Sequence, residues 1–323
     1  MHRTWLVTFI LKRLLYAVPL VVAVVVVNFI LIKAAPGDPV TVLIGDYPAT
    51  QDYIDQIRAQ YGLDQPLHVQ LWLYLSEVAK GNLGESLSQH QPVAALLLDR
   101  LGQTVKLTLT ALAIATVAGV ALGTVGARWR GTPVDSTTQG VTLLGYSVPE
   151  FWLGQLLIIV FAVNLGWLPL GGAQPVRGSD FTWLDVLPYL VLPALALSFR
   201  YTALIGRMTR ASLLEVDSAD FVTAARSRGL SDWQVLARHT VRNASPPVVT
   251  VIGYNLGYIL AGSVMIETVF SWPGIGRLLY ESITKRDYPV MTGILLMISI
   301  SVVLANLLTD IVHALIDPRV GRS

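Results

Sequence analysis

The stretch EVDSADFVTAARSRGLSDWQVLARHTVRN, residues 215–243, is a polar segment between two long apolar runs. Within it, Ser218 is placed to cap a short helix that runs through Arg228. Gly229 follows, at the position where helices often end with a positive φ. A second helix is expected to begin at once, because Ser231 and Gln234 fit an S-x-x-Q capping box. The stretch therefore predicts a helix–glycine–helix elbow held close to a membrane on both sides.

The rest of the chain has the composition of a membrane protein. Of its 323 residues, 53% are hydrophobic and 14% are charged, with a net charge of +2, whereas soluble domains carry about 25% charged residues. Cysteine is absent, which excludes a disulfide framework and thiolate chemistry. We expect an all-α, polytopic membrane protein.

Six apolar runs are long enough to cross the roughly 30 Å hydrocarbon core of a bilayer. They cover about 14–32, 104–127, 140–165, 187–205, 247–269 and 289–315. A cleaved signal peptide is the alternative for the first run. That run exceeds the usual apolar length of a signal, and Lys33-Ala34-Ala35-Pro36 is a poor cleavage site, so we expect a retained helix.

The distribution of basic residues predicts the orientation. One face of the predicted topology carries Arg3, Lys12, Arg13, Arg128, Arg130, Arg207, Arg210, Arg226, Arg228, Arg238, Arg242, Arg319 and Arg322. The short loops of the other face carry only Arg177, Arg277, Lys285 and Arg286. Both termini and the elbow are therefore expected in the cytoplasm.

Three parts are expected along the chain. Residues 1–33 form a cytoplasmic N-terminus and the first transmembrane helix. Residues 34–103 form an external loop domain with three short helices at 50–61, 66–80 and 92–101, each bounded by proline or glycine signals. Residues 104–323 form a core of five spans that includes the 215–243 elbow.

Motifs for covalent chemistry are missing from the sequence. There is no G-x-x-x-x-G-K-[ST] phosphate loop and no H-E-x-x-H zinc motif. Ser263 and His313 lie in different spans and suggest an intramembrane serine protease, but the Ser263 surroundings lack the flanking glycine and the oxyanion donors that such a site needs. We therefore expect a chain that is not an enzyme.

Three acidic residues lie at membrane depth, where an ionisable group is by default a functional candidate. Glu267 ends its span, so an interfacial position is expected for it. Asp310 suits either a satisfied polar packing site or a mechanistic role. Glu150 stands beside Pro149, which frees backbone groups, and it either tunes what passes or is a local peculiarity of this chain.

A family resemblance adds to these observations. The segment from Thr223 to Gly229 resembles the E-A-A-x-x-x-G signature of ABC-importer permeases, although alone it also fits an ordinary interfacial helix. RNASPPVVT at 242–250 is similar to a run of the dipeptide/oligopeptide/nickel branch. Further similar motifs are YGLDQPL at 61–67, GNLGES at 81–86, YSVPEFWLG at 146–154, SWPGIG at 271–276 and DPR at 317–319.

This resemblance, which covers nearly the whole chain, implies a type I ABC-importer permease fold in a bacterial inner membrane. The chain would be the non-catalytic permease subunit that moves peptides or similar small solutes from a substrate-binding protein into the cytoplasm. It implies a homologous second permease chain, two cytoplasmic ATPase subunits and an external substrate-binding protein as partners, with no nucleic acid. No cofactor is expected on this chain, because ATP and Mg would be held by the ATPase subunits.

Two sets of site residues are expected. The expected ATPase-coupling residues are Asp220, Phe221, Ala224, Ala225, Arg226, Arg228 and Gly229. The expected translocation path contains Ser147, Pro149, Glu150, Asn255, Gly257, Ser263 and Asp310. A channel or an ATP-independent transporter is the alternative, but the sequence has neither a filter loop nor an inverted-repeat pattern. The solute stays open among dipeptides, oligopeptides, nickel chelates and other small molecules.

Overall fold

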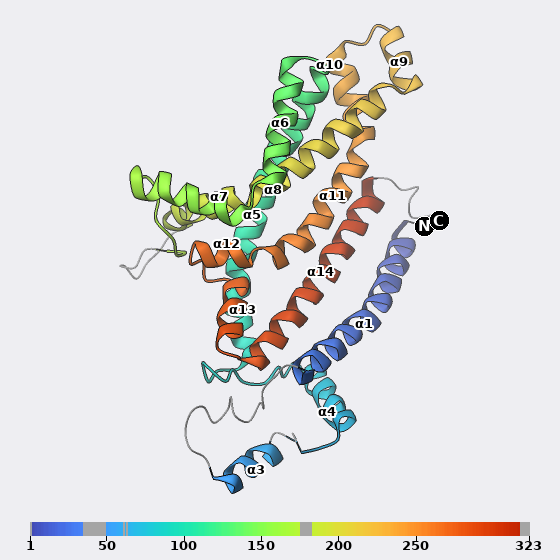
Figure 1. Ribbon diagram of the computed structural model, residues 1–323. Coiled ribbons are helices and arrows are strands. Elements are labelled where there is room, and N and C mark those ends of the chain that lie inside the picture. The colour runs from blue at the N-terminus through green and yellow to red at the C-terminus, as the bar shows by residue number, and fades with distance from the viewer. Residues whose placement is uncertain (1, 35–49, 61, 63, 175–182, 317–323) are drawn as a thin grey trace.

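The computed structural model describes residues 2–34, 50–60, 62, 64–174 and 183–316, and every element longer than a single bridge in these ranges is a helix (Figure 1). Three helices in the described ranges are long and apolar enough to cross a membrane, and a bent pair adds a fourth. A shorter apolar helix segment covers Val18–Leu31. The all-α membrane fold is thus confirmed. The predicted break at 36–39, the loop around Arg177 and the 317–319 motif lie outside the described residues.

The first predicted span lies within α1, His2–Ala34, which packs against the last helix, α14, Tyr288–Ile316. The two following helices are α3, Gln51–Gln60, and α4, Leu67–Ala79, as the sequence predicts. The ring of Phe29 on α1 stacks on Tyr74 of α4 with centroids 5.9 Å apart. Figure 1 shows α3 and α4 at the end of the molecule opposite the elbow.

The third short helix of the loop domain is not a separate element. It is the first part of α5, Val93–Arg128, which continues without a break through Gly102 into the second span. The prediction of a stop at Gly102 is wrong, because one glycine costs a helix only about 1 kcal/mol. The second predicted span and the last short helix of the loop domain are therefore one continuous helix.

The third predicted span is not one helix. It consists of α6, Pro133–Ser147, followed by α7, Glu150–Leu157, and a π-helical turn η1, Ile158–Asn164. The two halves are bent by 100°. The bend lies at Val148 and Pro149, which are both extended, because a residue before proline avoids the helical region.

The fourth span is longer than predicted, and the fifth is divided. The fourth is α8, Trp183–Asp217, which continues through Pro188 and Pro193 and past the membrane to the elbow. The elbow contains α9, Asp220–Ser227, α10, Asp232–Val235, and the π-helical turn η2, Leu236–Thr240. The fifth span is α11, Val241–Gly262, and a separate α12, Val264–Val269. An unpredicted helix, α13, Ile275–Thr284, precedes α14.

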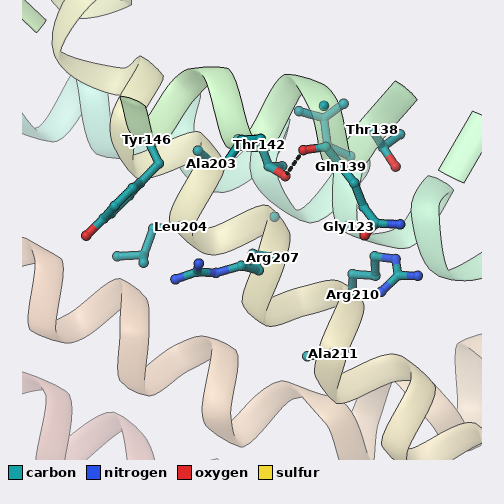
Figure 2. Close-up of a pocket in the computed structure, with 14 residues that line it drawn as sticks. Gly123, Thr138, Gln139, Thr142, Tyr146, Ala203, Leu204, Arg207, Arg210 and Ala211 are labelled. Carbon is teal, nitrogen blue, oxygen red and sulfur yellow. Dashed lines mark hydrogen bonds between the residues drawn. The ribbon is translucent and has the colours of Figure 1, made fainter. Parts of the chain in front are cut away.

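The centre of the described fold is the close contact between α5 and α8. A side chain at Gly123 would collide with the Gly206 carbonyl and with Thr209, so only glycine lets the two backbones approach this closely. Around this contact, the buried side chains include Leu107, Leu197 and Ile205. A pocket of about 390 Å³ lies beside it, between α5, α6 and α8 (Figure 2).

Candidate coupling site

The elbow lies at one end of the molecule, where α9 and α10 are next to the ends of α5, α6 and α8 (Figure 1). The predicted cap of its first helix is wrong. The Ser218 hydroxyl donates to the Glu215 carbonyl oxygen at 2.8 Å, and Ala219 takes the N-cap position without a side-chain bond. α9 therefore depends on packing and on ion pairs for its position, not on a capping hydroxyl.

The glycine and the second cap of the elbow are as predicted. Gly229 has a φ of +83°, and a Cβ there would meet nothing within 4 Å, so backbone conformation alone restricts this position. Ser231 accepts a hydrogen bond from the Gln234 backbone N–H, and the Gln234 side chain accepts one from the Ser231 N–H. This capping box starts α10 two residues after the turn.

One side of α9 is fixed against the rest of the elbow by a small apolar cluster. Val222, Ala225 and Val235 are buried there, and Val216 and Leu230 pack at its edge. Ala225 was expected on the surface that a partner approaches, and the structure contradicts this. Its position three residues after Val222 places both side chains on the inner face of the helix.

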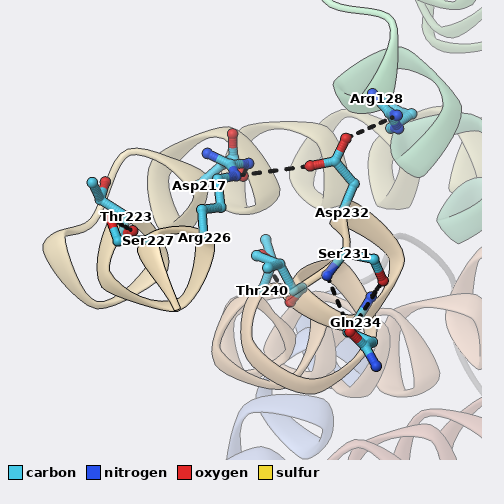
Figure 3. A network of polar contacts seen from close by, with 10 residues as sticks. Arg128, Asp217, Thr223, Arg226, Ser227, Ser231, Asp232, Gln234 and Thr240 are labelled. Atoms are coloured by element: carbon cyan, nitrogen blue, oxygen red, sulfur yellow. Dashed lines mark hydrogen bonds and ion pairs between the residues drawn. The ribbon is translucent and has the colours of Figure 1, made fainter. Parts of the chain in front are cut away.

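A series of ion pairs connects α9 to three other helices, α8, α10 and α5 (Figure 3). Arg226 on α9 donates to the Asp217 carboxylate at the end of α8, at 2.6 Å, and its Nε lies 4.0 Å from Asp232 at the start of α10. The other Asp232 oxygen lies 3.4 Å from Arg128 at the end of α5. Arg226 is one of the expected coupling residues, and its ion pairs in the structure are with Asp217 and Asp232 of the same chain.

The rest of the α9 surface is open. Phe221 is 46% exposed although it is a large apolar side chain, and Asp220 and Ala224 are exposed beside it. Arg228 is also exposed and makes no ion pair with the described residues. Trp233 on α10, which the sequence reading did not single out, is 73% exposed. The elbow thus presents apolar and cationic side chains outward while its inner face is anchored.

The expected translocation-path residues lie at several places in the fold. Ser147, Pro149 and Glu150 lie together at the α6–α7 bend, and Glu150 is near enough to Arg200 of α8 for electrostatic interaction. Asn255 is buried, and Gly257 packs against Val302 and Ala305 of α14. Asp310 is half-buried on α14. The pocket between α5, α6 and α8 is lined by none of the seven.

Ser263 belongs to a different arrangement, which the sequence reading missed. Its hydroxyl donates to Glu267 at 2.9 Å, and Thr104 on α5 donates to the same carboxylate at 2.8 Å. The Arg277 backbone N–H donates to the other oxygen at 3.0 Å. Glu267 is 0% exposed, so its carboxylate is enclosed by the protein, and its interfacial depth stays a prediction. Its carboxylate caps the start of α13, and the nearby Pro-Gly-x-Gly motif was the signal for such a turn.

Comparisons with known proteins agree with this architecture. The family described as "Binding-protein-dependent transport system inner membrane component" matches residues 115–322, and the N-terminal family of the same systems matches residues 6–108. A putative peptide permease protein of Brucella suis biovar 1 is 42% identical over 96% of this chain and 98% of its own length. The glutathione transport system permease protein of Escherichia coli O6:H1 is 39% identical, over 98% and 99%.

Solved structures show the same fold at low sequence identity. The MetNI methionine ABC transporter in an inward-facing conformation matches with a TM-score of 0.55 and 20% identity, over 69% of this chain and 96% of that one. An amino acid ABC transporter matches with a TM-score of 0.51 and 16% identity, over 68% and 93%. The family matches together cover nearly the whole sequence. The chain belongs to the inner-membrane components of binding-protein-dependent transport systems, as an ABC-importer permease of the branch that contains the peptide permeases.

Proposed function

We propose that the elbow is the ATPase-docking element of this permease and that the solute is a peptide or a similar small molecule. The single observation that carries the docking role is the two-sidedness of α9. Its inner face is packed on Val235 and tied by Arg226 to Asp217, whereas Phe221 and Ala224 are exposed on the outside. A large exposed aromatic on an anchored helix is typical of an interaction surface.

The arrangement suits a mechanical lever. Force applied to α9 passes through the Arg226–Asp217 pair to α8 and through the Asp232–Arg128 pair to α5, the two helices in closest contact at the centre of the fold. Closure of the ATPases would then rock the helices as rigid bodies between inward- and outward-open states. ATP and Mg would be bound by the two ATPase subunits, and this chain would contribute no covalent chemistry.

The proposed assembly contains a homologous second permease and an external substrate-binding protein. The peptide class rests on the relatives, which are described as a peptide permease and a glutathione permease. Family membership decides against the alternative of a channel or an ATP-independent transporter.

The docking role is tested by Ala224→Trp in the assembled transporter. The bulky side chain on the open face should prevent binding of the ATPase subunits and abolish ATP-dependent peptide uptake into proteoliposomes. Ala79→Trp is the matched control, because Ala79 is also exposed but ends α4 at the opposite end of the molecule. Its ATPase binding should equal that of the wild type.

A pull-down of the ATPase subunits, measured beside uptake of a dipeptide and of glutathione, separates the two parts of the proposal. Normal ATPase binding and uptake by Ala224→Trp would refute docking at α9. Uptake of neither peptide by the wild-type assembly, with ATPase binding intact, would instead refute the solute class.

A further inference from the structure

Three arginines on α8, at positions 200, 207 and 210, occupy the side of α8 nearest α6. Arg210 forms a bidentate pair with Asp135, at 2.7 and 2.8 Å, and Arg200 lies near Glu150. Arg207 is different. It is exposed and has no carboxylate partner among the described residues, and its guanidinium group lies 5.7 Å from the ring centroid of Tyr146 on α6.

The Arg207 side chain lies along a built cavity. The pocket of about 390 Å³ has apolar or small wall residues, among them Leu122, Gly140, Leu143 and Ala203. Arg207 and Tyr146 line it toward one end, and Thr138, Gln139 and Arg210 line it toward the other. Figure 2 shows Arg207 extending toward Leu204 and Tyr146, whereas Arg210 lies toward Gly123 and Thr138. The cavity thus combines one uncompensated cation with space for an apolar chain.

The cavity lies near the end of α5, where Trp129 and the neighbouring arginines predict the membrane interface. Gly206 and Arg210 on α8 are level with Gly123 on α5, and Gly123 precedes the exposed Trp129 by six residues, or about 9 Å of helix. Trp129 and its neighbouring arginines form an interfacial anchor. Arg207 therefore lies about 9 Å inward of that anchor on the cytoplasmic side, within reach of lipid headgroups for a long side chain.

We propose that this cavity is a binding site for an acidic phospholipid of the cytoplasmic leaflet. Arg207 contacts the phosphate, and an acyl chain enters the apolar part beside Gly140 and Leu143. Basic pockets between transmembrane helices on the cytoplasmic side suit anionic headgroups, and the same lipid would compensate a charge that the chain itself leaves unpaired. The site is separate from the elbow, and Tyr146 places it directly next to the α6–α7 bend.

Two variants test the site in different ways. Arg207→Gln removes the charge, whereas Gly140→Leu fills the cavity, since a side chain at Gly140 meets nothing within 4 Å and leucine favours a helix. The measurement is native mass spectrometry of the assembled transporter titrated with phosphatidylglycerol and, separately, with phosphatidylcholine. Each variant should weaken phosphatidylglycerol binding by about fivefold or more, the equivalent of one arginine contact.

Arg130→Gln is the matched control, because Arg130 is an exposed arginine outside the pocket and close to the same interface. It should retain the wild-type affinity. Equal losses in Arg207→Gln and Arg130→Gln would overturn the proposal in favour of general surface attraction. Equal binding of both lipids by the wild type, or unchanged binding by Gly140→Leu, would also overturn it.

Discussion

At the residue scale, a few backbone and charge features decide the properties of the elbow and of the external end. Gly229 is the clearest example of a backbone feature of this kind. Its φ of +83° is a conformation that a residue with a Cβ adopts at a cost of roughly 1–2 kcal/mol, and no neighbouring atom makes the position tight. The requirement at this position is therefore conformational and not steric.

Gly229→Val should misplace α9 relative to α10 and uncouple ATP hydrolysis from transport, while Gly229→Asn should retain most coupling because asparagine tolerates the left-handed region. The measurement is the ratio of solute uptake to ATP hydrolysis in proteoliposomes. Membrane insertion should be unchanged in both variants. A wild-type ratio in the valine variant would show that the turn does not transmit motion.

The buried Asp287, in the loop before α14, is the corresponding feature of the external end. It accepts hydrogen bonds from the Ser86 hydroxyl at 2.6 Å and from the Ser88 backbone N–H and hydroxyl at 3.0 and 2.9 Å. Burial by itself raises the pKa of Asp287, but these donors outweigh burial and leave the pKa below its ordinary value. The ionised form is therefore favoured in the folded protein.

Stability from Asp287 should be fully present above about pH 4, the unfolded value, and should be lost as the pH falls through the lower folded pKa. Asp287→Asn should lower the thermal unfolding temperature at pH 7 and flatten its acid dependence below pH 4. Unfolding of the purified chain followed by size-exclusion chromatography measures both. The same acid dependence in the variant and in the wild type would assign the effect to another carboxylate.

At the element scale, helix contacts are set by small residues and by buried polar groups. α5 and α8 approach at Gly123 and Gly206, and α12 and α13 are joined by the carboxylate of Glu267. Two π-helical turns continue α-helices: η1 follows α7, and η2 lies between α10 and α11. Of these features, η2 joins the elbow directly to α11.

Gly123→Leu should separate α5 from α8 and destabilise the fold by about 1–3 kcal/mol or more, the usual cost of overpacking. Gly102→Leu on the same helix is the control, because a Cβ at Gly102 meets nothing within 4 Å. The yield of monodisperse protein after extraction, and its unfolding temperature, should fall only for Gly123→Leu. Equal behaviour of the two variants would contradict close packing at Gly123.

At the scale of the whole molecule, the end that carries the elbow and the end that carries the loop domain are built from different helices. Figure 1 shows α9 and α10 at one end and α3 and α4 at the other. The surplus of arginine near α9 predicts that this end is cytoplasmic. A cysteine-free chain makes this orientation directly measurable.

Single cysteines at Asp55 on α3 and at Arg228 beside α9 should react differently with an impermeant thiol reagent in spheroplasts. Both positions are exposed. Asp55→Cys should be labelled in intact spheroplasts, and Arg228→Cys only after lysis. The reverse labelling pattern would show that the elbow is external and that the predicted orientation is wrong. Labelling of both after lysis is the control for accessibility.

The sequence by itself determined the membrane class, the approximate positions of the long helices, the elbow with its glycine and capping box, and the family. These features depend on signals within one or two turns of helix, such as Ser231 with Gln234, or on apolar runs of span length. They are readable without knowing what lies across the fold.

Only the tertiary structure decided the inward position of Ala225, the bend at Pro149, the continuity of α5 through Gly102 and the burial of Glu267. Each depends on a competing or distant partner. The donor that Glu267 needs from Thr104 is 163 residues away in the chain, and Arg226 pairs with Asp217 because α8 continues beyond the apolar run. Packing between helices that are far apart in the sequence decides which side chains meet. The sequence around any one residue does not show which distant residue will lie beside it.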